Sequence, residues 1–133
     1  MLRRKSRIVV DTNLWISYLL TGNSNLDKLL NSCKVLLLFS NELLSEFLEV
    51  AGRPKFRKFF SLEDVEILLS AIEPISELVA VSSEIQVCRD AKYNFFLALA
   101  QDGKANYLVT GDADLLVLKK FDKTIIVTIA EIS

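Results

Sequence analysis

Aspartates follow two short apolar segments that are typical of buried strands. Asp11 comes directly after residues 8–10 (IVV), and Asp112 and Asp114 come just after residues 107–110 (YLVT). Because the carboxyl ends of strands in an open parallel sheet line its ligand crevice, we expect these carboxylates to meet there. Like charges at short range are costly unless a proton or cation lies between them. Since Mg²⁺ prefers oxygen ligands, the pattern predicts a divalent-metal site at one edge of a sheet.

Asp11 and Asp112 each precede a predicted helix, so each is also a good candidate for an N-cap. The two interpretations are compatible, because a cap position also aims the carboxylate toward the strand ends. For the pair together we favour the metal site. Glu46 is the third candidate, at the edge of the apolar face of a helix predicted over residues 41–50. Its periodicity leaves open whether the side chain points into the crevice.

The chain contains no histidine. This absence excludes Ser-His-Asp and Cys-His catalysis within the polypeptide, as well as zinc sites built on imidazole. Any hydrolysis must rely on carboxylates, usually with a metal, or on lysine. A phosphatase with a strand-end aspartate as nucleophile is disfavoured. Such enzymes usually have an Asp-x-Asp pattern, and here Asn13 replaces its second aspartate.

The formal net charge of -1 gives no general reason to expect nucleic-acid binding. Such a partner would have to be held by local basic clusters. A solvated charged face explains each of the two clusters equally well. They are Arg3, Arg4, Lys5 and Arg7 near the N-terminus, and Arg53, Lys55, Arg57 and Lys58 in mid-chain.

Cysteine usage and hydropathy favour a cytoplasmic protein without membrane association. Cys33 and Cys88 lie far apart, in no metal-binding spacing, and are expected to be reduced, partly buried thiols. The apolar segment near the N-terminus ends at once in Asp11, and no small-residue cleavage site follows it. No segment approaches the roughly 18 apolar residues that a membrane span needs.

Short apolar runs alternate with helical patterns, which predicts an α/β domain over residues 1–133 with a mostly parallel sheet of four to five strands. The predicted strands are residues 7–10, 35–39, 78–81, 107–110 and 125–127. The predicted helices are residues 13–20, 25–33, 41–50, 61–72, 93–101 and 113–118. Residues 93–101 are almost entirely apolar, so this helix is expected to be buried on most sides.

The ordered set of motifs resembles the PIN-domain family of metal-dependent nucleases, which includes the VapC-type toxins of bacterial toxin–antitoxin pairs. Residues 107–116 (YLVTGDADLL) carry the most specific part of the resemblance. The other parts are VVDTN at 9–13, LLSEF at 43–47, RPKF at 53–56, CRD at 88–90, FFLALA at 95–100, and IVT at 126–128 with Glu131.

The resemblance implies a three-layer α/β/α fold and an endoribonuclease that cleaves single-stranded RNA with Mg²⁺ or Mn²⁺. Asp11, Glu46 and Asp112 match the family's catalytic metal ligands, and Asp114 matches an auxiliary acidic residue. Thr110 and Asn13 are expected to orient a carboxylate or a water. The implied partners are the RNA substrate, a cognate antitoxin of a type II pair, and a second copy in a homodimer.

The sequence departs from the family at the head of the helix predicted over residues 93–101. Tyr93 occupies a place where the family usually has an aspartate, and tyrosine is neutral near pH 7. Asp90, three residues earlier, reaches the site if the helix begins sooner. Alternatively, the chain is a catalytically degenerate module that still binds RNA or protein. A third explanation is a single-nucleotide change, selected because it inactivates a toxic nuclease.

Overall fold

A central six-stranded sheet organises the computed structural model, which describes residues 5–86 and 93–132. Its order is β3-β2-β1-β4-β6-β5, and all neighbouring strands are parallel except β5, which is antiparallel to β6. The predicted α/β class is confirmed, with one strand more than expected because the two-residue β5 is too short to show a pattern. The strands are β1 (Ser6–Val10), β2 (Val35–Phe39), β3 (Ser76–Leu78), β4 (Tyr107–Val109), β5 (Lys120–Phe121) and β6 (Thr124–Val127).

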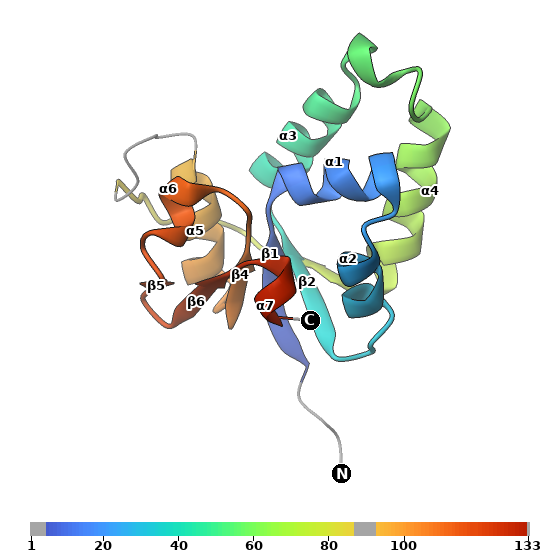
Figure 1. Cartoon of the computed structure of the whole chain (residues 1–133). Helices are drawn as coiled ribbons and strands as arrows, with labels where there is room; N and C mark the ends of the chain where they lie inside the picture. Colours follow the sequence, from blue (N-terminus) through green and yellow to red (C-terminus); the bar gives the residue numbers. More distant parts are fainter. Residues whose placement is uncertain (1–4, 87–92, 133) are drawn as a thin grey trace.

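Helices flank this sheet on both sides, as the three-layer prediction requires. Figure 1 shows α1 to α4 above and beside β1 and β2, and α5 and α6 beside β4, β5 and β6. The helices are α1 (Thr12–Thr21), α2 (Ser24–Leu30), α3 (Asn41–Ala51), α4 (Leu62–Ile72), α5 (Asn94–Asp102), α6 (Ala113–Leu116) and α7 (Ile129–Ile132). Two 3-10 turns are η1 (Pro54–Phe56) and η2 (Glu73–Ile75). Within the described ranges, no helix combines the length and apolar character of a membrane span.

Side-chain caps fix where the helices begin. The Ser40 hydroxyl accepts the N–H of Leu43 at the start of α3. Ser61 and Asp64 form a reciprocal capping box at the start of α4, which satisfies two backbone donors at once. These caps confirm the sequence-predicted starts of both helices and thereby fix the register of α3, which carries Glu46.

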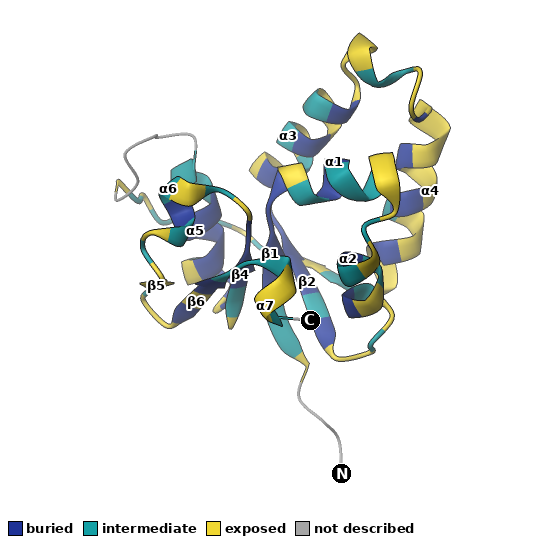
Figure 2. Cartoon of the chain, viewed as in Figure 1, coloured by how far each residue is buried: buried dark blue, intermediate teal, exposed yellow. Residues whose placement is uncertain are grey.

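The core lies between the sheet and the inward faces of the helices (Figure 2). The middle and end of β1 are fully buried, and in α5 the whole segment from Phe96 to Ala100 is buried, as its apolar sequence predicts. Trp15 of α1 stacks on Phe39 of β2, with ring centroids 5.9 Å apart. This packing holds α1 against the strand end that precedes α3.

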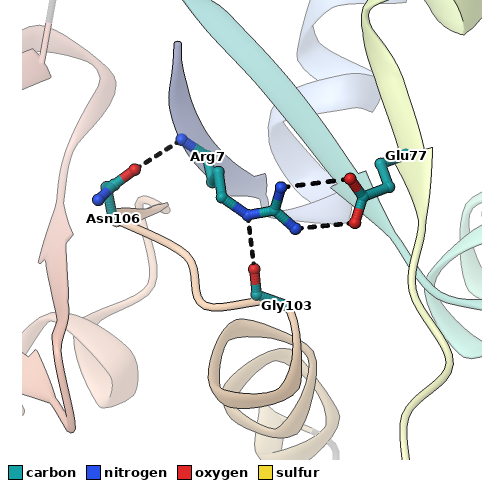
Figure 3. Close-up of polar contacts among 4 residues, drawn as sticks. All are labelled: Arg7, Glu77, Gly103 and Asn106. Carbon is teal, nitrogen blue, oxygen red and sulfur yellow. Dashed lines mark hydrogen bonds and ion pairs between the residues drawn. The ribbon is translucent and has the colours of Figure 1, made fainter. Parts of the chain in front are cut away.

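Arg7 ties three parts of the fold together at the start of β1, away from the strand's carboxyl end (Figure 3). Its guanidinium makes a bidentate ion pair with Glu77 of β3, and its Nε donates to the carbonyl of Gly103 at 2.7 Å. Its backbone N–H donates to the Asn106 side chain at 2.8 Å. Arg7, one member of the N-terminal basic cluster, therefore has a structural role. Arg3 and Arg4 lie outside the described residues.

Two predicted elements end three residues earlier in the structure than expected. The strand predicted at 78–81 lies at Ser76–Leu78, because the pairing of Leu37 with Ser76 sets an earlier register on an edge strand that tolerates polar residues. The second helix ends at Leu30, short of Cys33, whose positive φ of 61° cannot continue a helix. Cys33 is also exposed rather than partly buried. Cys88 lies outside the described residues.

Candidate active site

The candidate site lies between β1 and β4, where the chain stops adding strands on one side of β1 and begins adding them on the other. From β1 the chain adds β2 and β3 on one side, and then β4 and β6 on the other. Val10 pairs with Val109 across the β1–β4 junction, and the N–H of Asp11 donates to the carbonyl of Val109 at 3.0 Å. The carboxyl ends of β1 and β4 therefore meet at a topological switch point, the usual ligand position in open α/β sheets.

Asp11 is buried at this junction, with 2% of its surface exposed. Its Oδ1 accepts the backbone N–H of Asn13 at 3.1 Å, so it is the N-cap of α1. Its Oδ2 accepts the hydroxyl of Thr110 at 2.6 Å. The N-cap interpretation is confirmed, and the same carboxylate also faces the end of the neighbouring strand.

Thr110 links the carboxylate of Asp11 to the backbone of Asp112. Its fully buried hydroxyl donates to Asp11 and accepts the backbone N–H of Asp112 at 3.0 Å. Asp112 in turn caps α6, because its Oδ1 accepts the N–H of Asp114 at 2.8 Å. Thr110 thus joins Asp11 to the backbone of Asp112, and its expected role in orienting a catalytic carboxylate or a water stays a prediction.

Glu46 approaches from α3. Leu43 and Phe47 on that helix are buried, whereas Glu46 beside them is half-buried. Its Oε2 accepts a hydrogen bond from the hydroxyl of Thr12, the buried residue that follows Asp11. No role of Thr12 was predicted. The only available signal was a polar residue between a strand-end aspartate and an apolar helix.

The remaining predicted residues contribute less directly. Asn13 is exposed and supplies its backbone N–H to Asp11, and Asp114 is half-buried and supplies its backbone N–H to Asp112. Asp90 lies outside the described residues. Tyr93 directly precedes α5, and its half-buried ring stacks on Phe96 at 6.3 Å. An aromatic ring packed against the core thus occupies the position at which the resemblance to the PIN-domain family led us to expect a carboxylate.

The donor chemistry suits a hydrated divalent cation. Within residues 5–86 and 93–132, no group of three or more Asp, Glu, His or Cys side chains is arranged to hold a metal ion. Mg²⁺, however, typically keeps several waters and is bound through only one or two carboxylates. Asp11 and Asp112, coupled through Thr110, provide two such groups. Oxygen donors of this kind fit Mg²⁺ or Mn²⁺, and Asp11 and Asp112 are the acidic residues that the hydrogen bonds of Thr110 link.

Comparison with known proteins identifies the family. The model of the PIN domain matches residues 7–114. A protein of Methanocaldococcus jannaschii described as "Uncharacterized protein MJ1680" is 32% identical over 123 residues, which cover 90% of this chain and 79% of the relative. The chain belongs to the PIN-domain family, which confirms the resemblance seen in the sequence. PIN domains are generally nucleases, and they generally use divalent metal ions.

Proposed function

We propose that this protein is an endoribonuclease that cleaves single-stranded RNA with Mg²⁺ or Mn²⁺. The observation that carries the proposal is the hydrogen-bonded series at the switch point, in which Thr110 couples Asp11 to Asp112. Thr12 brings Glu46 to the residue next to Asp11. Because the chain has no histidine, these carboxylates are the groups best suited to phosphodiester hydrolysis.

Asp11, Glu46 and Asp112 hold the metal in this proposal, with Asp114 as an auxiliary acid. The chemistry that a bound ion supplies is activation of water for in-line attack on phosphorus and stabilisation of the leaving oxygen. Thr110 and Thr12 orient the carboxylates that they contact, in the way that outer partners of metal ligands commonly do. Asn13 fixes Asp11 through its backbone N–H.

The proposed biological role is that of the toxin of a type II toxin–antitoxin pair. VapC-type toxins belong to the same family, which supports this role. The proposal includes a cognate antitoxin as partner, a homodimer as the working state, and the cytoplasm as the location. Expression of the chain alone should arrest growth, and co-expression of a small protein encoded next to it should restore growth. A harmless chain that nevertheless cleaves RNA in vitro would contradict the toxin role.

One observation favours a second function, a degenerate module that binds RNA or protein without cleavage. Tyr93 places a neutral ring, stacked on Phe96, where a carboxylate is usual. Asp11, Glu46 and Asp112 then lack the fourth carboxylate that is usual at position 93. This loss weakens the attraction for a cation and lowers turnover. The two functions predict different effects of Tyr93→Asp on RNA cleavage.

The decisive assay is cleavage of a labelled single-stranded RNA by the purified chain, with Mg²⁺, with Mn²⁺ and with a chelator. The proposal predicts metal-dependent cleavage that Asp11→Asn abolishes. Tyr93→Asp should raise the rate if the natural site is merely weakened. Absence of cleavage in both the natural chain and the Tyr93→Asp variant, together with retained RNA binding, supports the degenerate module. Cleavage that persists in chelator or in Asp11→Asn overturns the metal mechanism.

A further inference from the structure

The connection between α3 and α4 carries a local excess of positive charge. Figure 1 shows it projecting beyond the ends of the two helices at the top of the view, and Figure 2 shows it mostly exposed. We call residues 53–60 (RPKFRKFF) the basic tip. Four of its eight residues are cationic, and the chain has no Asp or Glu between Glu49 and Glu63. This charge contrasts with the net charge of -1 of the whole chain.

Two of the four cations are engaged by the fold. Arg57 donates through Nη2 to the carbonyl of Ala51, and its guanidinium lies 5.4 Å from the ring centroid of the buried Phe60. Arg53 pairs with Glu49 at 3.0 Å, one helical turn earlier. Arg57 therefore attaches the tip to the end of α3, and the carboxylate of Glu49 partly neutralises the charge of Arg53.

The other two cations, Lys55 and Lys58, are exposed and directed over aromatic rings. The ammonium groups lie 5.1 Å from the ring centroid of Phe56 and 5.3 Å from that of Phe59, respectively. In the part of the chain that the structure describes, neither lysine has an ion-pair partner. Their charges are thus available to an anion from solution.

Phe59 differs from the aromatic residues beside it. Phe56 and Phe60 stack on each other at 5.4 Å and pack into the core, whereas Phe59 remains 60% exposed. An exposed ring beside an ammonium group provides the two elements that single-strand binding surfaces combine, a face for base stacking and a cation for phosphate. A lone exposed phenylalanine would be unremarkable, but Phe59 lies within the basic tip.

The shape of the tip is fixed before any ligand binds. Pro54 begins the turn η1, and the N–H groups of Phe59 and Phe60 both donate to the carbonyl of Phe56. Preorganisation of this kind lowers the entropic cost of binding. The tip also continues the helix that carries Glu46. At about 1.5 Å of rise per residue, the end of α3 lies about 7.5 Å along its axis from Glu46.

We propose that the basic tip is a docking surface for the single-stranded RNA substrate. Lys55 and Lys58 neutralise phosphates, and Phe59 stacks on an unpaired base outside the carboxylate site. That the ligand is the RNA substrate rests on the proposed function. The charge of the tip favours a polyanion over a protein surface as its occupant.

The test is fluorescence anisotropy of the full chain with a labelled single-stranded RNA of about 12 nucleotides, a length within the usual range of site sizes. A chelator is present, so binding is measured without cleavage. The test variant combines Lys55→Gln with Lys58→Gln. The matched control combines Lys120→Gln with Lys123→Gln, two exposed lysines at the β5–β6 hairpin on the far side of the molecule (Figure 1). Phe59→Ala tests stacking separately, and thermal unfolding checks that each variant is folded.

The variant with both tip lysines replaced should bind RNA about tenfold more weakly. The slope of the logarithm of the binding constant against the logarithm of the salt concentration should become shallower by about 1.4, because each neutralised phosphate contributes about -0.7. Phe59→Ala should weaken binding about fivefold or more without changing the salt slope. Equal losses in the tip and hairpin variants overturn the proposal, because the effect would then reflect general charge. Unchanged RNA binding with loss of a dimer also overturns it, in favour of a protein interface.

The outcome is separable from that of the proposed activity. Cleavage without tip-dependent binding overturns this inference and leaves the nuclease proposal standing. Tip-dependent binding without cleavage at any metal concentration supports the docking surface and contradicts the nuclease proposal.

Discussion

Thr12 donates its hydroxyl hydrogen to Oε2 of Glu46, a residue 34 positions further along the chain. The bond joins the first residue of α1 to the middle of α3, directly beside the buried carboxylate of Asp11. Glu46 is only half-buried, so without this contact its flexible side chain would have several orientations open to it. In the proposed enzyme, Thr12 is therefore a positioning residue for a metal ligand.

Thr12→Val tests this positioning role, because it keeps the shape of the side chain and removes the donor. We expect metal affinity and RNA cleavage to fall by roughly 10- to 100-fold, the usual cost of losing an outer partner of a ligand. Thr12→Ser retains the hydroxyl and should stay close to the natural chain. Calorimetric titration with Mn²⁺ and the cleavage assay provide the two readouts. Equal behaviour of the valine and serine variants would show that the hydroxyl has no positioning role.

Thr110→Val should reduce stability, because it leaves buried Asp11 without one donor and the N–H of Asp112 without its acceptor. The expected loss is about 1–3 kcal/mol in the free energy of unfolding, measured by urea denaturation in metal-free buffer. Thr110→Ser preserves both hydrogen bonds and should lose less. If the valine variant is as stable as the natural chain, the Thr110 hydroxyl does not hold the Asp11 carboxylate and the Asp112 backbone in place.

Tyr18 gives a pH-dependent prediction outside the site. Its hydroxyl donates to Asp27 at 2.6 Å, and this bond, with burial and the charge of Asp27, raises the pKa of Tyr18 to about 12 from 10.0. Because the pKa is raised in the folded state, the associated stability is present below pH 10 and is lost as the pH rises toward 12. An ultraviolet titration should show a tyrosine that ionises late, and Asp27→Asn should lower the pKa of Tyr18. Late ionisation that persists in Asp27→Asn would refute the assignment.

Gly103 marks a close approach between α5 and the sheet. A Cβ built there would lie 2.9 Å from both Cδ1 of Leu38 and the carbonyl oxygen of Leu99, which is too close without displacement of the backbone. Gly103→Ala is expected to destabilise the fold by about 1–3 kcal/mol, as overpacking typically does. Gly111→Ala is the matched control, since its Cβ would meet nothing within 4 Å. Thermal unfolding of the two variants should rank them in that order, and the reverse order would contradict the packing argument.

The main elements were predictable because they rest on local signals. Residues 35–39 form a strand as predicted, and α4, capped by Ser61, starts within one residue of the predicted helix over 61–72. By contrast, α7 is only four residues long and was missed. Its start depends on reciprocal hydrogen bonds between Thr128 and Glu131, which a single turn of sequence does not distinguish from a loop.

The site was predictable in part for the same reason. Strand-end aspartates and a parallel sheet place Asp11 and Asp112 at one edge, because strand register is set by apolar pattern. The contact between Thr12 and Glu46 depends instead on how α1 packs against α3, which no local pattern encodes. The ring of Tyr93 stacked on Phe96 likewise follows from packing at the head of α5.

Electron paramagnetic resonance of Mn²⁺ tests the proposed metal site most directly. It compares binding to the natural chain with binding to Asp11→Asn, Glu46→Gln and Asp112→Asn. We expect a bound-metal signal in the natural chain that each of these substitutions weakens strongly. Glu49→Gln, on the exposed part of α3, is the matched control and should leave it unchanged. Equal Mn²⁺ binding in the natural chain and in all three site variants would contradict the assignment of Asp11, Glu46 and Asp112 as the metal site.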